Sequence, residues 1–350
     1  MKKSKNIFVI FVILIGFICV SCVANARVIY SSECNSNTIV LNTLKQYYNA
    51  ALSQAQGVQI DKRKLDTLQI YSKRVNYGGR GSNLCVFYID PFDLNLNKFN
   101  SSQLYFFSDG SFLFPTVLDT SSGMDLKSYM FSKLEKFTFD SYKGIKIDEG
   151  NKRNDDEIVM FLSLECPHCA NLYNYLYYYL IQTKKTITDT NLGIKDFNFY
   201  IFLTSSNIEK VKLFKGLQDN NINIGTILFD YYGNKNLMLG DANTLIDYYY
   251  NNYLNKIDKF KSVNDLRALV KKAEVNNMVN EFNRLNIDAT PITFINNQPV
   301  IGADMSVISV LLKEANIADL NTIDSALKEY SKKMQQQQEQ LQKQQGKNKK

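Results

Sequence analysis

The sequence predicts an α/β fold, and two short segments carry most of that prediction. In residues 158–176, an apolar run (IVMFLSL) precedes the motif C-P-H-C, and a run with helical spacing (ANLYNYL) follows it. The first run is typical of a buried strand and the second of a helix. In residues 289–302, the dipeptide Thr290-Pro291 is followed by two short strand-like runs. Between these segments, residues 207–285 have helical periodicity and contain no proline, and residues 305–315 form a last helix-like run.

The C-P-H-C motif can be a redox dithiol or half of a zinc site. His168 is the only histidine in the 350 residues, so a Cys₂His₂ zinc site is impossible, and so is a Ser-His-Asp triad elsewhere. A strand, then C-x-x-C, then a helix is the context that favours a redox dithiol. The free N–H groups of a first helical turn stabilise a thiolate there, and Pro167 suits the first helical position. His168 adds a nearby group that can be cationic, so the pKa of Cys166 is expected to lie below that of an ordinary thiol.

These residues resemble the thioredoxin-fold thiol:disulfide oxidoreductases, and C-P-H-C is similar in particular to the periplasmic DsbA-like branch. The segment T-P-I-T-F-I-N-N-Q-P-V-I-G, residues 290–302, resembles that family's cis-proline loop, strand and hairpin. The resemblance covers about residues 155–318. It implies a thioredoxin-like fold in which a cis Thr290–Pro291 peptide faces the dithiol and helps bind the substrate. The 122 residues from Cys169 to Pro291 suit family members with an inserted helical domain, here about residues 207–285.

The resemblance also implies a mechanism without a cofactor or a metal. Cys166 is expected to attack a substrate disulfide and Cys169 to resolve the mixed disulfide. One position departs from the family pattern: Met160 stands where DsbA-like members carry a buried acid. Proton transfer to Cys169 would then use water or another group, such as Glu157.

Oxidase and isomerase activities both stay open. The dipeptide Pro167-His168 is typical of oxidases, whereas Thr290 before the cis-proline is common among isomerases. The expected substrates are secreted or envelope proteins with cysteines, and a membrane redox partner would reset the dithiol. Two other functions remain as alternatives, a non-catalytic envelope chaperone that keeps the fold and a structural metal-binding protein.

The first 26 residues are typical of a signal peptide. Three lysines are followed by an apolar run at residues 7–20 and by Ala24-Asn25-Ala26, a suitable cleavage site. A mature chain starting at Arg27 and a periplasmic location are therefore expected, with an uncleaved anchor or lipidation at Cys22 as alternatives. The formal net charge is +7, but the signal peptide supplies +3 and residues 332–350 supply +5, which leaves −1 for the rest. A nearly neutral body gives no support to a nucleic-acid partner.

Residues 27–150 are expected to form a small α+β domain. Residues 38–54 have helical spacing, and residues 104–115 (LYFFSDGSFLFP) are typical of a hairpin with an Asp-Gly turn. The strand–Asp-Gly–strand unit resembles the N-terminal dimerisation domain of DsbC- and DsbG-type isomerases, which allows a homodimer. The charged segment 144–156 marks the expected boundary with the redox domain, residues 151–320.

Four cysteines remain after the signal peptide. If Cys166 and Cys169 form the active dithiol, Cys34 is left to pair with Cys85 in a structural disulfide. That bond would close a loop of about 50 residues and contribute roughly 3–4 kcal/mol in the chain-entropy model. Two unpaired thiols, or a four-cysteine zinc site, are the alternatives. The last segment, residues 321–350, is rich in Gln and Lys and is expected to be disordered or a frayed helix.

Overall fold

The structure is a computed structural model, and it describes residues 34, 42–48, 70–77, 80–89, 97–99, 104–148, 155–187, 192–257 and 259–347. The contacts within the chain group it into two compact units, residues 1–118 and 119–350. The predicted signal peptide lies outside the described residues. No described helix combines the length and the apolar character needed to cross a membrane.

The first unit contains a four-stranded antiparallel sheet. Its strands follow in chain order, β1 (Ile70–Tyr77), β2 (Arg80–Ile89), β3 (Phe106–Ser108) and β4 (Leu113–Phe114). The predicted hairpin at residues 104–115 is confirmed, since Ser108 pairs with Leu113 across the turn. Asp109 stabilises the turn by accepting two backbone N–H bonds of 2.8 Å, and Gly110 supplies the positive φ of +94° that favours glycine.

A helical segment and a disulfide complete the core of this unit. Residues 42–48 are helical, within the range predicted, and bury Leu44 and Tyr48. The Tyr48 hydroxyl donates a 2.8 Å hydrogen bond to the Leu104 carbonyl, so the buried hydroxyl has a partner. Cys34 and Cys85 are joined by a disulfide with sulfurs 2.09 Å apart, and both belong to the hydrophobic cluster of this unit.

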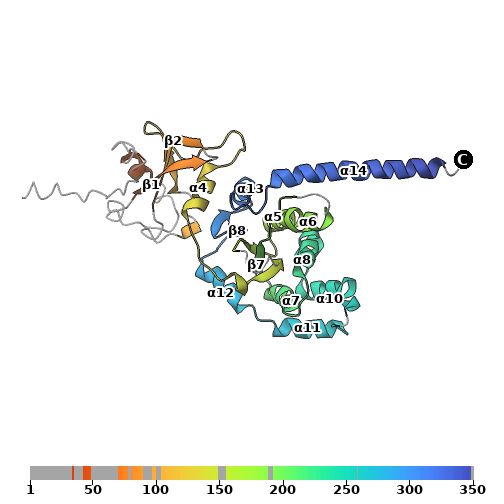
Figure 1. Cartoon of the computed structure of the whole chain (residues 1–350). Coiled ribbons are helices and arrows are strands. Elements are labelled where there is room, and N and C mark those ends of the chain that lie inside the picture. The colour runs from red at the N-terminus through yellow and green to blue at the C-terminus, as the bar shows by residue number, and fades with distance from the viewer. Residues whose placement is uncertain are drawn as a thin grey trace, which may run out of the picture. The chain divides into compact units, whose positions relative to one another are not determined.

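The second unit is built on a five-stranded sheet with the order β5-β7-β6-β8-β9. Its strands are β5 (Ile145–Asp148), β6 (Glu157–Ser163), β7 (Asn198–Thr204), β8 (Ile292–Ile295) and β9 (Gln298–Ile301). Strands β6 and β7 are parallel, and every other neighbouring pair is antiparallel. A β-α-β half and a β-β-α half are thus both present, as the sequence predicts (Figure 1).

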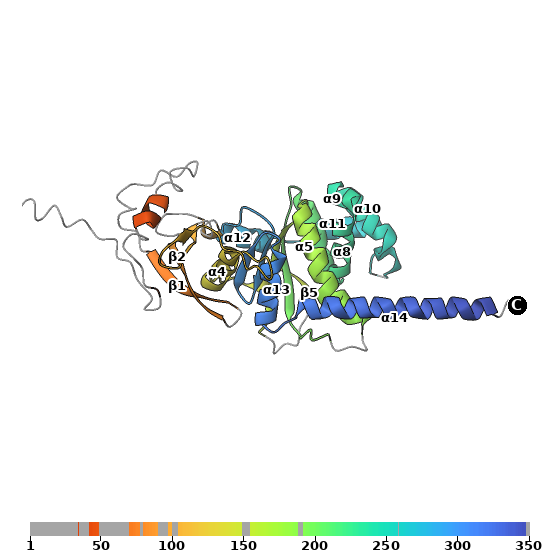
Figure 2. The same cartoon turned by 90° about the horizontal axis from the view of Figure 1, so that it is seen from above.

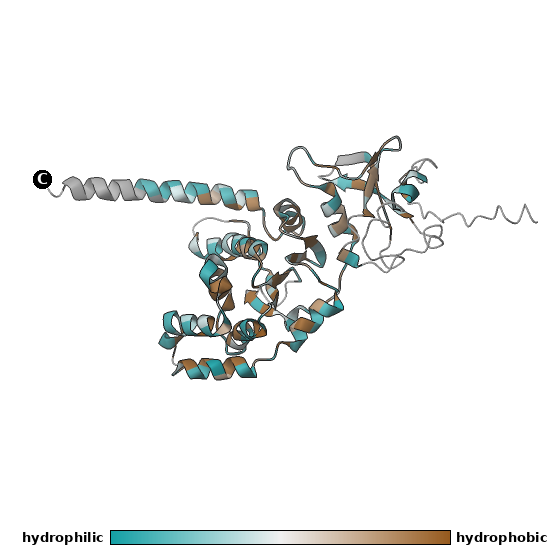
Figure 3. Cartoon of the chain, turned by 180° about the vertical axis from the view of Figure 1, so that it is seen from behind, coloured by the Kyte–Doolittle hydropathy of each residue, from teal (hydrophilic) through white to brown (hydrophobic). Residues whose placement is uncertain are grey.

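The two central strands are apolar because both of their faces are covered. In β6 (EIVMFLS) and β7 (NFYIFLT), the five inner residues of each strand are buried. Phe161 and Phe202 stack with ring centres 4.5 Å apart, and Phe294 of β8 contacts Phe161 edge to face. Figure 3 shows brown along these strands, while brown and teal alternate around the helices of this unit.

Helices fill the connections between the strands. Between β6 and β7 lie α5 (Pro167–Tyr177), the π-helical turn η4 (Tyr178–Gln182) and α6 (Thr183–Thr186). Between β7 and β8 lie α7 (Ile208–Asp219), α8 (Ile224–Gly233), α9 (Lys235–Leu239), α10 (Ala242–Asn252), α11 (Val263–Lys272) and α12 (Asn276–Arg284). We call α7–α12 the helical insertion. Most of its helices begin at an Asn, Asp or Ser whose side chain accepts a backbone N–H, which explains where they start.

The sheet unit begins earlier in the chain than the sequence suggests. Helix α4 (Leu126–Leu134) lies in the segment assigned to the N-terminal domain, yet it packs against β9. The Ser132 hydroxyl donates to the Pro299 carbonyl, and the Tyr129 hydroxyl donates to Glu314 of α13 (Met305–Glu314) at 2.6 Å. The contact boundary accordingly falls at residues 118–119 and not near 150.

The last helix, α14 (Leu320–Lys347), runs through the segment expected to be disordered. It extends away from the sheet as one long helix in both views (Figures 1 and 2). Gln, Lys, Glu and Leu are all strong helix formers, and no proline or glycine interrupts them before Gly346. The structure thus has a helix here, which was one of the two alternatives expected for this segment, a disordered tail or a frayed helix.

Candidate active site

The two cysteines of C-P-H-C occupy different environments at the start of α5. Cys166 is the N-cap of the helix and is half-buried, while Cys169 lies one turn further on and is fully buried. Pro167 takes the first helical position, where its missing N–H costs no hydrogen bond. The first bond of the helix runs from the Ala170 N–H to the Cys166 carbonyl at 3.1 Å. Both sulfurs are free thiols.

Burial makes Cys169 a poor nucleophile. It raises the pKa of the Cys169 thiol to about 12, even though hydrogen bonds with Thr290 and with the Ser163 N–H act in the opposite direction. The Ser163 N–H lies 3.4 Å from the Cys169 sulfur. Cys169 is therefore protonated at neutral pH in the reduced protein, and the more accessible Cys166 is the sulfur that a partner can reach.

The Thr290–Pro291 loop faces the dithiol. The Thr290–Pro291 peptide bond is cis, and the Cys166 sulfur lies 3.7 Å from the Thr290 carbonyl oxygen. The Pro291 carbonyl accepts the Gly302 N–H at 2.9 Å, which fixes the loop to the end of the β8–β9 hairpin. Cys166, Cys169, Thr290 and Pro291, which are far apart in the sequence, are thus brought together.

The other predicted site residues are Pro167 and His168, between the two cysteines, and Cys34 and Cys85 in the first unit. Pro167 and His168 are exposed in the first turn of α5. Cys34 and Cys85 form the disulfide of the first unit. Within the described residues, no cluster of three or more His, Cys, Asp or Glu side chains could hold a metal ion.

Glu157 does not reach the dithiol. It is the first residue of β6 and accepts a 2.8 Å hydrogen bond from the Ser141 hydroxyl, and burial raises the pKa of its carboxyl group. Ser163 ends the same strand, so roughly 20 Å of extended chain separates Glu157 from the cysteine end. Met160, between them, is fully buried in the core. The suggestion that Glu157 transfers a proton to Cys169 is therefore wrong.

Two tyrosines of α8, to which the sequence analysis gave no role, hold the end of β6. The Tyr232 hydroxyl donates to the Ser163 carbonyl at 3.1 Å, and the Tyr231 hydroxyl donates to the Leu164 carbonyl at 3.0 Å. The backbone directly before Cys166 is therefore tied to the helical insertion. The only sequence signal was the adjacent pair of tyrosines, which does not reveal a partner 67 or 69 residues away.

We call the hydrogen bonds of Tyr231 and Tyr232 to the Leu164 and Ser163 carbonyls the clamp. A close approach of α5 and α8 makes the clamp possible. The Tyr173 hydroxyl of α5 donates to the Gly225 carbonyl at 3.0 Å. A Cβ atom on Gly225 would lie 2.6 Å from the Tyr177 ring, so glycine is required for the two helices to meet here.

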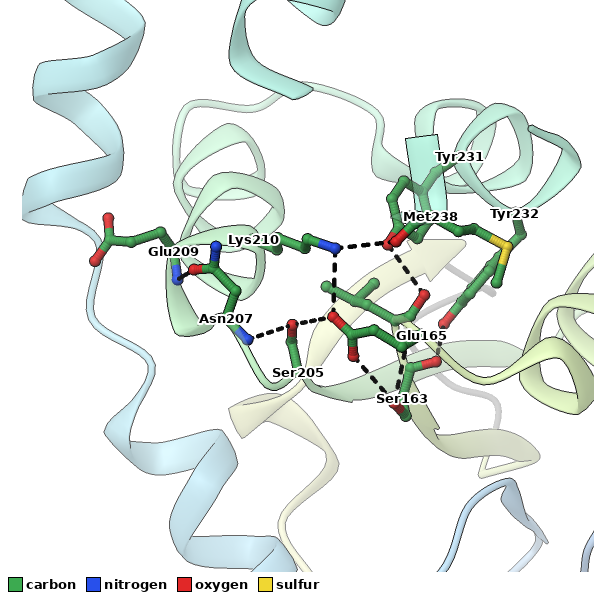
Figure 4. A network of polar contacts seen from close by, with 10 residues as sticks. Ser163, Glu165, Ser205, Asn207, Glu209, Lys210, Tyr231, Tyr232 and Met238 are labelled. Atoms are coloured by element: carbon green, nitrogen blue, oxygen red, sulfur yellow. Dashed lines mark hydrogen bonds and ion pairs between the residues drawn. The ribbon is translucent and has the colours of Figure 1, made fainter. Parts of the chain in front are cut away.

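Sequence reasoning also missed Glu165 and Lys210. Glu165, directly before Cys166, forms an ion pair with Lys210 of α7 at 3.4 Å (Figure 4). The Lys210 ammonium also donates to the Met238 carbonyl at 3.0 Å and is almost completely buried. Nothing in the sequence distinguishes this lysine from the other lysines of α7.

Comparison with known proteins agrees with this description of the domain. Residues 145–314 match the family model described as Thioredoxin. No curated protein matches the chain.

Several solved structures of thiol-disulfide exchange proteins are similar to the chain. One is the thiol-disulfide exchange protein alpha-DsbA2 from Wolbachia pipientis, with 18% identity over 48% of this chain and 84% of that one, and a TM-score of 0.32. Another is oxidised BdbD from Bacillus subtilis, with 14% identity, coverage of 51% and 97%, and a TM-score of 0.36. The oxidoreductase DsbA from Xylella fastidiosa has 13% identity, coverage of 48% and 93%, and a TM-score of 0.33. The strand order, the C-P-H-C helix start and the family match together identify the region around residues 145–314 as a thioredoxin-like domain.

Proposed function

We propose that the protein is a thiol:disulfide oxidoreductase that oxidises or isomerises disulfides through Cys166 and Cys169. The observation that carries the proposal is the difference between the two sulfurs. Cys166 is accessible at a helix N-terminus beside the Thr290 carbonyl, and Cys169 is buried with a pKa of about 12. An attacking and a resolving thiol need this difference.

In the oxidising direction, a substrate thiolate attacks the Cys166 sulfur of the Cys166–Cys169 disulfide. A mixed disulfide forms and Cys169 leaves. The raised pKa of Cys169 then favours protonation of its thiolate. A second substrate thiolate then attacks the substrate sulfur of the mixed disulfide and releases Cys166. The substrate loses two electrons and gains a disulfide, and the protein ends with two reduced cysteines.

In the isomerising direction, reduced Cys166 attacks a wrong substrate disulfide and forms a mixed disulfide. Another substrate thiolate then attacks the substrate sulfur of the mixed disulfide and releases Cys166. Alternatively, Cys169 attacks the Cys166 sulfur, which releases the substrate thiol and leaves a Cys166–Cys169 disulfide on the protein. The exposed Pro167-His168 dipeptide would influence which direction prevails. The Thr290–Pro291 loop lies where a substrate strand could pair beside Cys166. Thr290 and Pro291 are therefore the proposed substrate-binding residues.

We place this activity in the periplasm, on secreted or envelope proteins, because residues 1–26 have the pattern of a signal peptide. The Cys34–Cys85 disulfide is consistent with an oxidising compartment. A membrane protein would reset the dithiol. Dimerisation through the N-terminal unit would allow two dithiols to share one substrate and would favour isomerisation, whereas a monomer would favour net oxidation.

Reduction of insulin disulfides and oxidation of a reduced, unfolded substrate test the activity, with Cys166→Ser as the control. Activity that survives in Cys166→Ser would overturn the role proposed for Cys166, and a wild type without either activity would favour the non-catalytic chaperone. Sedimentation of the mature chain then tests the dimer: a monomer excludes a shared substrate cleft. The reduction potential of the Cys166–Cys169 couple separates a strong oxidant from an isomerase or reductase.

A further inference from the structure

A cluster of charged and hydroxyl side chains lies directly before Cys166 and has no part in the exchange steps described above (Figure 4). Its centre is the Glu165 carboxylate, which accepts hydrogen bonds from the Ser205 hydroxyl and, at 3.3 Å, from the Ser163 hydroxyl. The Lys210 ammonium completes the cluster at 3.4 Å from the same carboxylate. Three side chains from two stretches of the chain, residue 163 and residues 205–210, therefore meet at Glu165.

Lys210 is in an unusual position for a lysine. Its side chain is only 6% exposed, and a buried ammonium group is costly unless it is paired. It also lies in the first turn of α7, three residues after the N-cap Asn207, where a positive charge opposes the helix dipole. A lysine at this position serves neither solubility nor helix stability. Its contacts with the Glu165 carboxylate and the Met238 carbonyl explain why it is there.

The cluster is connected to both sulfurs through the backbone turn 163–166. Glu165 is covalently bonded to Cys166, and the Ser163 carbonyl accepts the Cys166 N–H at 3.2 Å. The Ser163 N–H lies 3.4 Å from the Cys169 sulfur. A shift of Glu165 would therefore move the groups that contact each cysteine.

We propose that Glu165 and Lys210 are positioning residues whose opposite charges offset each other, so that neither charge alone biases the equilibrium between the reduced dithiol and the disulfide. The inference rests on the proposed thiol exchange. By Coulomb's law, the Glu165 carboxylate and the Lys210 ammonium act in opposite directions on a negative charge that develops at the start of α5. Paired, the two charges nearly cancel, and the turn keeps its geometry.

The test is the equilibrium with glutathione, in which the protein disulfide and two glutathione thiols yield the protein dithiol and one glutathione disulfide. Glu165→Gln should raise the equilibrium constant for this reduction roughly three-fold, and Lys210→Met should lower it by a similar factor. The double variant should return close to wild type. If the pair served only to hold the fold, the single variants would move the constant in the same direction or leave it unchanged, and either result would overturn the inference.

The half-buried ion pair Glu209–Lys212 on the same helix, at 2.9 Å, supplies matched controls. Glu209→Gln and Lys212→Met should leave the constant unchanged, and shifts as large as those at Glu165 and Lys210 would overturn the inference. If Glu165→Gln, which leaves the buried Lys210 ammonium without its counter-ion, does not fold, Lys210→Met and the double variant still decide, because neither contains a buried ammonium without its partner. If the wild type reacts with glutathione no more than Cys166→Ser does, the thiol exchange itself is refuted. If the wild type reacts and the variants leave the equilibrium constant unchanged, only the charge pair is refuted.

Discussion

In the folded, reduced protein, a thiol-alkylating reagent should modify Cys166 and leave Cys169 intact. Alkylation requires the thiolate and access to the sulfur, and Cys169 lacks both. Burial raises its pKa from 9.0 to about 12, which lowers its thiolate population at neutral pH by roughly 1,000-fold. The sulfur is also fully covered by the surrounding side chains.

The assay is a time course with iodoacetamide at pH 7, followed by mass spectrometry of the peptides that carry each cysteine. The rate for Cys166 should exceed that for Cys169 by more than 100-fold in the folded protein, because burial lowers the thiolate population of Cys169 roughly 1,000-fold and also covers its sulfur. In guanidinium chloride the two rates should become similar, which controls for any local sequence effect. Rates within about tenfold of each other in the folded protein would refute the argument that burial separates the two roles.

Three further results are expected. The folded-state pKa of Cys169 lies above its value in the unfolded chain, so the reduced protein should lose stability as the pH rises from about 9 towards 12, by about 1.4 kcal/mol at pH 10. Denaturant titrations measure this loss, and an equal loss of stability in Cys169→Ala would contradict the reasoning. Replacing both Cys34 and Cys85 by Ala should lower the free energy of unfolding of the first unit by roughly 3–4 kcal/mol, seen as a lower denaturant midpoint without reductant. Tyr232→Phe should cost about 1 kcal/mol and slow thiol exchange, because the Ser163 carbonyl loses its donor. Tyr250→Phe, which removes a hydroxyl bond in an exposed position, is its control, and equal effects of the two variants would argue against the clamp.

Local signals in the sequence were sufficient for most of the fold. The C-P-H-C motif between an apolar run and a helical run placed the dithiol at a helix start, and Asp109-Gly110 placed a hairpin turn. Such features depend on residues that are close together in the chain, whose conformational preferences act before any tertiary contact. The cis Thr290–Pro291 peptide came from the family resemblance and not from residue chemistry alone.

The parts that the sequence could not supply depend on contacts between distant segments. The Lys210–Glu165 pair joins residues 45 positions apart, and it exists only because α7 begins beside the end of β6. The segment that contains helix α4 was grouped with the N-terminal domain, because the sequence does not show that this helix packs against β9, more than 160 residues later in the chain. The boundary between the two units at residues 118–119, earlier in the chain than expected, follows from that packing.

The helical insertion braces β6 near both of its ends. At the Ser163 end, Tyr232 of α8 holds the backbone before the dithiol. Near the Glu157 end, the hydroxyl of Ser141 bonds to Glu157, and Lys143 of the same short turn pairs with Glu281 of α12 at 2.8 Å. Burial alone would raise the pKa of Glu281, but hydrogen bonds from Arg284 and Lys143 lower it below its ordinary value.

This arrangement makes the helical insertion part of the redox site. If α7–α12 were replaced by a short loop, the Ser163 and Leu164 carbonyls would lose their tyrosine donors, and Glu165 would lose its counter-ion. The N–H group that contacts Cys169 lies in that same turn. Any displacement of the helical insertion would therefore change the surroundings of both sulfurs through the turn at residues 163–166.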